Sequence, residues 1–347
     1  MEDTLLTGPK VAIIVPVYNM ERYLRECLDS LVGQTFRDIE IICFNDASTD
    51  SSIDILREYA ARDERFVIID SPVNIKQGGG RNAGIRASRA PYIMFVDPDD
   101  WVEPDFVEKL YMAACTTSSD LAVCDHNDVI DGTPKPNSFL GNNLGSDTIK
   151  IKQLRFSGSV LICECLYSRD LFFSNNLFFP EGIQLGEDTA ISCSLFLAAN
   201  KIVKIDEFLY NYRYRPGSSC RGNHESLFRH YFTTALLARE NQHRVDKDNK
   251  FYDTIEDLFI RWYYVLPIMH ALKSYDHVLY EGIQYAQSTI KNYVNEVELK
   301  KCISSLKKGD QITLKLLKHS LFLGALFFKI RLIRGRILSQ LSKDTKR

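Results

Sequence analysis

The feature of the sequence that most constrains its fold is a regular alternation of short apolar runs and amphipathic segments between residues 10 and 125. The runs have the length of buried strands, and the segments between them carry apolar residues at helical spacing, as Leu24, Leu28 and Leu31 do. This βαβα order predicts an α/β fold with a mostly parallel sheet that helices cover on both faces. The expected strands are Val11–Val15, Glu40–Phe44, Val67–Asp70, Tyr92–Val96 and Leu121–Cys124, and the expected helices include Gly78–Arg89 and Pro104–Thr116.

The alternation becomes irregular after Cys124. Residues 126–150 are rich in Asn, Gly, Asp and Pro and are expected to form a long excursion or flap. Residues 155–215 are expected to mix short strands with loops, and the pattern is helical from Glu225 to Lys308. These changes predict three parts: a domain over residues 1–220, a helical region over 221–310 and a tail over 311–347.

Polar and glycine-rich clusters lie next to the expected strands. In a parallel sheet the carboxyl ends of the strands share one edge, where ligands of open α/β sheets bind. Each cluster alone is also explained as a turn or a helix cap, as Tyr18-Asn19 before the first expected helix would be. Together the four clusters predict one binding crevice. They are Pro16–Asn19, Asn45–Asp50, Asn74–Gly84 and Asp97–Asp100.

The last cluster, Asp97-Pro98-Asp99-Asp100, has the most specific chemistry. Three carboxylates at one sheet edge repel one another unless a cation lies between them. Hard divalent cations prefer oxygen ligands, and Mg²⁺ is usually shared between one or two carboxylates and a substrate phosphate. The cluster therefore favours a metal that carries a phosphorylated ligand, and an acidic surface turn is the alternative.

The order and spacing of these clusters resemble the family-2 glycosyltransferases, a group of nucleotide-sugar-dependent enzymes with the GT-A fold. The resemblance runs from about Lys10 to Ser219 and includes all four clusters, with Asp97-Pro98-Asp99 in the place of the metal-binding acidic motif. Glu187-Asp188 match a later acidic pair of the family. Tyr210–Ser219 resembles a segment that closes over the diphosphate in many members.

This resemblance implies a GT-A type fold: a mostly parallel Rossmann-like sheet flanked by helices, followed by a helical C-terminal region. A nucleotide-sugar part is expected over about residues 10–125 and an acceptor part over about 126–220. Asp99, with help from Asp97, is expected to hold Mg²⁺ or Mn²⁺. The residues expected to bind the nucleotide-sugar are Pro16, Tyr18, Asn19, Asp46, Arg81, Asp97, Arg213 and Arg215.

The chain also departs from the family pattern. Asn45 and Ala47 stand where an Asp and a Gly are usual. Cys163-Glu164-Cys165 occupy a stretch where relatives often carry a Trp or Asn and a Lys, so the resemblance leaves the acceptor side open. Trp101 and Glu187 are the acceptor-side candidates, although Trp101 is also explained as a core or rim aromatic residue.

The expected reaction moves a hexose or N-acetylhexosamine from a UDP-sugar to a glycan or lipid-linked acceptor. Negative charge develops on the leaving diphosphate, where the metal acts as a Lewis acid and Arg213 or Arg215 adds a charge-assisted contact. Asp188 is the expected general base in a single inverting displacement, and capping of a helix near Thr189 is its alternative role. Asp46 is expected to accept a hydrogen bond from uracil N–H, which favours UDP.

Two other readings stay open. A sugar nucleotidyltransferase would also use an α/β sheet and a metal, but it predicts a Gly-rich basic loop after the first strand, where this chain has Pro16–Asn19. A catalytically inactive, membrane-associated scaffold predicts loss of Asp99 or Asp188, and the sequence keeps both.

Charge is unevenly distributed along the chain. Residues 311–347 hold nine Lys/Arg and one Asp, a charge of +8, which leaves −10 for residues 1–310 of a chain with formal charge −2. A basic amphipathic helix over Ile312–Leu341 is expected to bind an anionic membrane surface, or alternatively to pack on the protein or on a second subunit of a homodimer. Nucleic acid is not an expected partner, because the basic residues share this tail with many apolar ones.

The nine cysteines have no zinc-type spacing and are expected to be reduced thiols. Residues 1–10 lack the apolar region of a signal peptide, and the longest apolar stretch, Leu321–Phe328, is too short to span a bilayer. The expected location is cytoplasmic, at the inner face of the cell membrane.

Overall fold

The computed structural model describes residues 8–138, 140–155, 161–183, 186–215, 225–261, 265, 292, 294 and 296–319. The chain divides into two compact units. The first consists of Met1–Gly222 and Leu236–Lys250, and the second of Asn223–Ala235 and Phe251–Arg347. Helix α8 (Glu225–Val245) contributes to both units.

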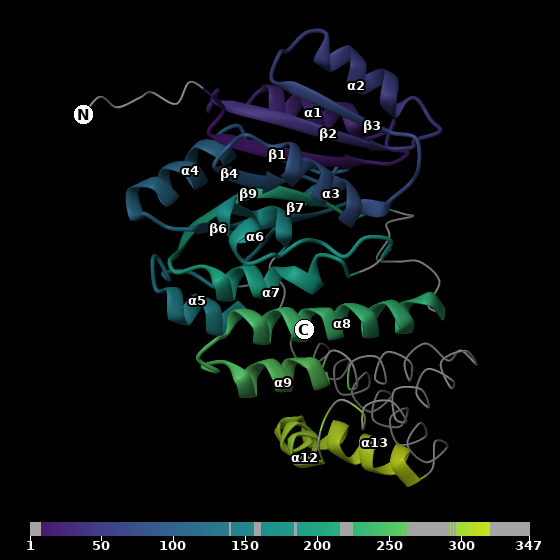
Figure 1. Ribbon diagram of the computed structural model, residues 1–347, viewed down its shortest axis with the longest axis vertical. Coiled ribbons are helices and arrows are strands. Elements are labelled where there is room, and N and C mark those ends of the chain that lie inside the picture. Colours follow the sequence, from purple (N-terminus) through teal and green to yellow (C-terminus); the bar gives the residue numbers. More distant parts are fainter. Residues whose placement is uncertain are drawn as a thin grey trace, which may run out of the picture. The chain divides into compact units, whose positions relative to one another are not determined.

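The first unit is built on a sheet, most of whose strands are labelled in Figure 1. The described strands follow the order β3-β2-β1-β4-β8-β6-β9-β5, with β7 paired to β6. β1, β2, β3 and β4 pair in parallel, as the βαβα pattern predicts, and β6 is parallel to β9. β8 runs antiparallel to both of its neighbours, so the sheet is mixed. The strands are β1 (Val11–Val17), β2 (Ile39–Asp46), β3 (Phe66–Ser71), β4 (Tyr92–Phe95), β5 (Trp101–Val102), β6 (Leu121–Ile130), β7 (Thr133–Asn137), β8 (Cys165–Ser168) and β9 (Ile202–Arg213).

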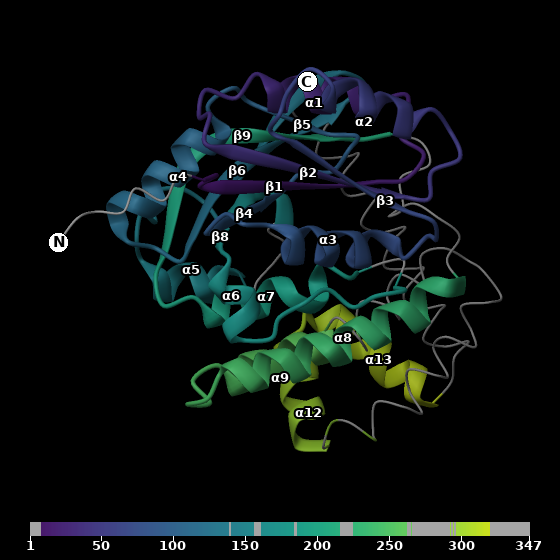
Figure 2. The same ribbon diagram turned by 45° about the horizontal axis from the view of Figure 1, so that its top comes forward.

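Helices cover both faces of this sheet, which explains why β1 and β2 are buried along their whole length. Figure 2 shows α1 and α2 on one side of the strands and α3 on the other. The helices of this part of the chain are α1 (Leu24–Val32), α2 (Ser52–Ala60), α3 (Lys76–Ala87), α4 (Phe106–Thr117), α5 (Thr148–Arg155), α6 (Asp170–Ser174) and α7 (Thr189–Ala198), with the 3₁₀ turn η1 (Ile162–Glu164).

Helix α3 packs closely against its neighbours because several of its glycines face them. A Cβ on Gly84 would come within 2.5 Å of Ile14 Cγ2, and one on Gly80 within 2.8 Å of Phe44 Cδ1. A third glycine, Gly78, meets the carbonyl oxygen of Pro180, which a Cβ would approach to 2.5 Å. The Gly-rich cluster therefore acts first as a packing surface that sets α3 against β1, β2 and the segment that leads to α7.

The expected flap over residues 126–150 is wrong. Strand β6 continues to Ile130, turns at Asp131-Gly132 and returns as β7, and α5 follows. Asp131 and Gly132 have φ of 50° and 76°, the left-handed conformations that a two-residue hairpin turn needs. The expectation of short strands later in the chain is also wrong for β9, which has 12 residues.

The second unit is helical in its described part, as expected. It contains α9 (Tyr252–Ile260), α12 (Glu296–Ser305) and α13 (Lys308–His319). Of the tail helix expected over Ile312–Leu341, α13 covers residues up to His319, and residues 320–341 lie outside the described part. In the described part of the chain, we find no helix with the length and apolar character needed to cross a bilayer.

Candidate active site

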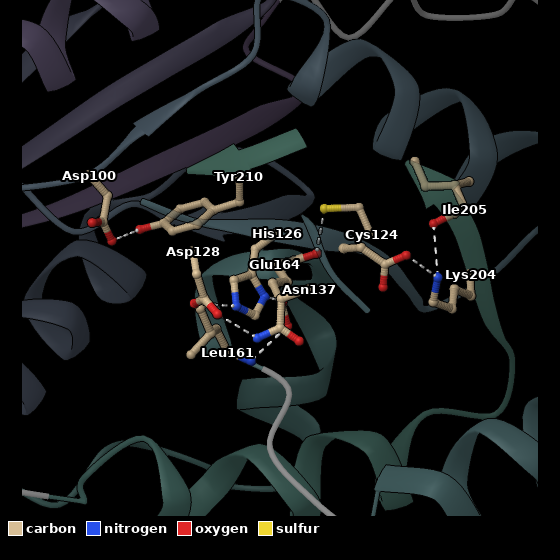
Figure 3. Close-up of polar contacts among 11 residues, drawn as sticks. Asp100, Cys124, His126, Asp128, Asn137, Leu161, Glu164, Lys204, Ile205 and Tyr210 are labelled. Carbon is tan, nitrogen blue, oxygen red and sulfur yellow. Dashed lines mark hydrogen bonds and ion pairs between the residues drawn. The ribbon is translucent and has the colours of Figure 1, made fainter. Parts of the chain in front are cut away.

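The acidic cluster forms the loop between β4 and β5. Its third carboxylate, Asp100, is buried and accepts hydrogen bonds from the Tyr210 hydroxyl (2.6 Å, Figure 3) and from Arg213 N (2.7 Å). The Tyr210 oxygen accepts a bond from Asp97 N at 3.2 Å. Burial, together with the charges of Asp99 and Asp97, raises the pKa of Asp100 well above its ordinary value. Asp100 therefore anchors the loop to β9, which leaves Asp97 and Asp99 as the candidate metal ligands of the loop.

Arg81 lies at the centre of the site and joins two acidic motifs. Its guanidinium donates to Asp97 Oδ1 through Nη2 and to Glu187 Oε1 through Nη1, both at 2.7 Å. Only 3% of its side chain is exposed, and its Nε has no hydrogen-bond partner among the described residues. Burial opposes its charge, but the carboxylates of Asp97 and Glu187 outweigh burial and raise its pKa. Arg81 thus lies inside a buried ion network.

The second carboxylate of the cluster, Asp99, has a guanidinium of its own. Arg215 Nε donates to Asp99 Oδ2 at 2.5 Å, and Arg213 Nε donates to the Asp99 carbonyl at 2.8 Å. Burial and the neighbouring Asp97 raise the pKa of Asp99, while Arg215 acts in the opposite direction. Arg213 also bonds Glu26 at 2.6 Å and lies 4.5 Å from the Trp101 ring centroid. Both predicted arginines are therefore next to the acidic loop.

The pair Glu187-Asp188 stands at the start of α7. Asp188 is the N-cap residue, and its Oδ1 accepts a bond from Thr189 N at 2.6 Å, so its alternative capping role is present. Glu187 is 5% exposed. Burial and the charge of Asp188 raise the pKa of Glu187 to about 7, against the lowering effect of Arg81. Through Arg81 this acidic pair is tied to Asp97.

Three loops meet at the carboxyl ends of β1, β2 and β3. Asp46 is buried, which raises its pKa, and its Oδ1 accepts a bond from Ile75 N at 2.6 Å. Asn19 Oδ1 accepts one from Thr49 N at 2.8 Å, while Tyr18 is 45% exposed. The expected capping of α1 by Tyr18-Asn19 is wrong, because that helix begins at Leu24 and Asn19 bonds the neighbouring loop instead. Pro16 lies within β1, opposite Phe44 of β2.

A buried polar cluster beside η1 was missed by sequence reasoning (Figure 3). His126 Nδ1 contacts Glu164 Oε1, and His126 Nε2 lies 3.3 Å from Asp128 Oδ1. Glu164 Oε2 accepts a bond from Leu161 N at 2.7 Å, and Asn137 donates to Asp128 at 2.9 Å. Burial alone would lower the pKa of His126, but Glu164 and Asp128 outweigh it and raise that pKa. The cluster fixes the stretch where the sequence departs from the family pattern.

A metal at this site would find few protein ligands. The described residues hold no group of three His, Cys, Asp or Glu side chains placed to bind one ion. Asp97 and Asp99 supply carboxylate oxygens from one short loop, which fits an ion that takes one or two protein carboxylates and completes its shell with phosphate and water.

Comparisons with known proteins agree on one family. The sequence profile of glycosyl transferase family 2 matches residues 12–172. EpsH of Bacillus subtilis (strain 168), named as a glycosyltransferase, is 35% identical over 257 residues, which are 71% of this chain and 74% of EpsH. The poly(ribitol-phosphate) beta-glucosyltransferase of Bacillus spizizenii is 35% identical over 207 residues, 58% of this chain and 32% of that enzyme.

Other matches extend this picture. The chain spans only 32% of glycosyltransferase GlyA of Streptococcus pneumoniae serotype 4, to which it is 34% identical over 231 residues, 62% of this chain. Among solved structures, residues 1–349 of S. aureus TarS in complex with UDP-GlcNAc align with a TM-score of 0.58 at 19% identity, covering 82% of this chain and 92% of TarS 1–349. At this identity the likeness shows the fold, which is of the GT-A type.

Proposed function

The chain belongs to glycosyl transferase family 2, and on that premise we propose that it transfers a hexose or N-acetylhexosamine from a UDP-sugar to a glycan or lipid-linked hydroxyl in cell-surface polysaccharide synthesis. One observation carries the proposal: Arg81 joins the acidic loop at the end of β4 to the Glu187-Asp188 pair at the start of α7. A donor diphosphate bound at the acidic loop and an acceptor hydroxyl bound at the Glu187-Asp188 pair would then lie on opposite sides of the transferred sugar.

The uridine would bind at the carboxyl ends of β1 and β2. The buried carboxylate of Asp46 would meet the uracil N–H, and the exposed ring of Tyr18 would cover the base. Asn19 shapes this end by holding the first loop against the second, and Pro16 lies in β1 just before that loop. TarS has been solved with UDP-GlcNAc and with UDP, which supports a uridine nucleotide as the donor here.

Mg²⁺ or Mn²⁺ would be held by Asp99, with Asp97 beside it, and when bound it would neutralise the charge that develops on the leaving diphosphate. The residues of the chain do the remaining work on this side. Arg213 is fixed by Glu26 and the Asp99 carbonyl and would present its charge to the diphosphate. Trp101, under Arg213, would form the rim toward the acceptor.

Asp188 would act as the general base. Its capping bond to Thr189 N fixes the direction of its carboxylate, which would take the proton of the attacking hydroxyl. Attack opposite the leaving diphosphate inverts the anomeric centre in one step, so no covalent nucleophile is required. Glu187 would act through Arg81, by holding that guanidinium against Asp97.

An Asp188→Asn variant tests this assignment. Asn caps helices about as well as Asp, so the fold and the α7 N-terminus should be kept. We expect sugar transfer to fall about 10²–10⁴-fold, while the affinity for UDP with Mn²⁺ changes less than about twofold. Asp105→Asn, at the start of α4 outside the site, is the matched control with unchanged transfer. Unchanged transfer in Asp188→Asn, or loss of UDP binding, would reject the base role.

We further propose that the basic C-terminal tail binds an anionic membrane surface at the inner face of the cell membrane. Residues 320–347 carry seven Lys/Arg and one Asp. Removing residues 320–347 should abolish sedimentation with anionic liposomes and leave binding of UDP with Mn²⁺ intact. Unchanged sedimentation would reject the membrane role, and a change from dimer to monomer instead would assign the tail to a second subunit.

A further inference from the structure

The two carboxylates proposed to hold the metal are each paired with a different arginine. Asp97 bonds Arg81, and Asp99 bonds Arg215 at 2.5 Å. The side chains of Asp99 and Arg215 are only 16% and 14% exposed, so water screens their attraction poorly. A guanidinium therefore already neutralises the carboxylate that the metal is expected to use.

The two arginines differ in how firmly the rest of the structure holds them. Arg81 is bonded by Asp97 on one side and Glu187 on the other. Arg215 lies two residues beyond the end of β9, and Asp99 is its one ion-pair partner among the described residues. Among the described residues its other contacts are weak for a charged group: the Arg215 guanidinium lies 3.6 Å from Met20 Sδ and 5.3 Å from the Tyr23 ring centroid. Within the described part of the chain, release of Arg215 breaks one ion pair, whereas release of Arg81 breaks two.

The other arginine at the end of β9, Arg213, makes different contacts from Arg215. It donates to the Asp99 carbonyl and to Glu26, and it stacks on Trp101. The bond from Arg213 to Asp99 goes to the backbone carbonyl, so Arg213 occupies no carboxylate oxygen that is proposed to bind the metal. Of the two arginines at the end of β9, Arg215 alone occupies a carboxylate oxygen that a metal would take.

We propose that Arg215 is a stand-in cation: it holds Asp99 until a nucleoside diphosphate arrives, and it then exchanges this carboxylate for the diphosphate oxygens. A divalent ion alone must displace a positive guanidinium and leave it near a second positive charge. An ion that arrives with a diphosphate supplies Arg215 with a new anionic partner at the same moment. The metal and the nucleotide should therefore bind together, and free metal should bind poorly. This inference rests on the proposed UDP-sugar function.

The exchange predicts a coupling that can be measured without any transfer reaction. By linkage, the nucleotide raises the metal affinity by the same factor as the metal raises the nucleotide affinity. If Arg215 disfavours binding of the free metal, this factor should be large. Removing Arg215 takes away the competitor of the free ion and the partner of the diphosphate. Arg215→Gln should thus bind free Mn²⁺ more tightly and show weaker coupling between Mn²⁺ and UDP.

The experiment is a titration of Mn²⁺, followed by electron paramagnetic resonance, on the full chain with and without UDP. Relative to the native protein, Arg215→Gln should bind free Mn²⁺ about tenfold more tightly, and the increase in Mn²⁺ affinity caused by UDP should shrink about tenfold. Arg62→Gln, which removes an exposed guanidinium paired with Glu58, is the matched control and should behave as the native protein. The gain in affinity for free Mn²⁺ should vanish in the double variant Arg215→Gln/Asp99→Asn. That loss would assign the bound ion to Asp99.

Equal free Mn²⁺ affinity in the native protein and Arg215→Gln would overturn the stand-in role while leaving the proposed function intact, provided that UDP still increases Mn²⁺ binding. Absence of any effect of UDP on Mn²⁺ binding in the native protein would instead reject the proposed function and the inference with it. Circular dichroism of each variant shows whether the fold is kept, and Arg215→Lys, which keeps the positive charge, should lie between the native protein and Arg215→Gln.

Discussion

Asp97 and Glu187 lie far apart in the sequence and accept hydrogen bonds from one guanidinium, each at 2.7 Å from a different nitrogen of Arg81. This contact links α3 to the end of β4 and to the start of α7. The metal side and the base side of the proposed site are therefore not independent, because a shift of Arg81 would move both.

Arg81→Lys should lower the free energy of unfolding by about 2–3 kcal/mol, since an ammonium cannot form the same pair of bonds and leaves one buried carboxylate without its charged donor. Urea unfolding measures the change. Arg86→Lys is the control, because Arg86 pairs with Glu181 at the surface at 3.5 Å and should cost less than about 0.5 kcal/mol. Equal losses of stability in the two variants would show that the contact of Arg81 with Asp97 and Glu187 does not stabilise the fold more than a surface ion pair does.

Gly78→Ala tests the contact between α3 and the segment before Glu187. A Cβ at this position would come within 2.5 Å of the Pro180 carbonyl oxygen and 3.2 Å of Phe179 Cβ, so we expect a loss of about 1–3 kcal/mol in the free energy of unfolding and a loss of sugar transfer. Gly8→Ala, which has no neighbour within 4 Å, should change neither quantity. Retention of full stability and transfer in Gly78→Ala would contradict this packing.

Ala47→Gly should make the protein more stable. Ala47 has φ of 57°, a left-handed conformation that is unfavourable for a residue with a Cβ and free for glycine, so the expected gain is about 0.5–1 kcal/mol in the free energy of unfolding. The same change in a helix, Ala113→Gly in α4, should instead cost about 1 kcal/mol. Thermal unfolding of both variants checks the opposite signs, and a loss of stability in Ala47→Gly would be inconsistent with the left-handed turn.

The buried His126 should make stability depend on pH. Glu164 and Asp128 raise the pKa of His126 in the folded protein, so protonation of His126 stabilises the fold. This stabilisation is fully present below the ordinary histidine pKa of about 6.5. It is lost as pH rises through the raised pKa of the folded protein. The difference in the free energy of unfolding between the native protein and His126→Gln should therefore shrink from pH 6 to pH 9. Glu164→Gln removes the main charged partner and should flatten this dependence, and a difference that grows with pH would contradict the assignment.

The sequence predicts the first half of the sheet well because β1, β2 and β4 are short apolar runs buried on both faces. It fails for β6 because the polar residues Asp125 and His126 interrupt the apolar pattern. In the structure they are buried by pairing with Lys204 of β9 and Glu164 of η1. The one local signal that could have located the hairpin is the Asp131-Gly132 dipeptide between Ile130 and Thr133.

For the site, the motifs show which residues come together but not how they pair. Arg81 meets Asp97 and Glu187 over separations of 16 and 106 residues, and no local pattern specifies such contacts. The pairing of His126 with Glu164 is hidden for the same reason, although Glu164 stands out as a departure from the family pattern. The chemistry of the site predicts which types of residue it contains. Which of these residues bond one another depends on how elements distant in the sequence pack together.

The most direct test of the account is a thermal-shift titration of UDP, GDP, CDP and dTDP, each with and without Mn²⁺. A ligand that binds only the folded protein raises its melting temperature, so binding at Asp46 and the acidic loop predicts the largest rise for UDP with Mn²⁺ and a much smaller one for UDP alone. No rise with any nucleotide, or equal rises with all four, would contradict a metal-dependent uridine nucleotide site in this protein.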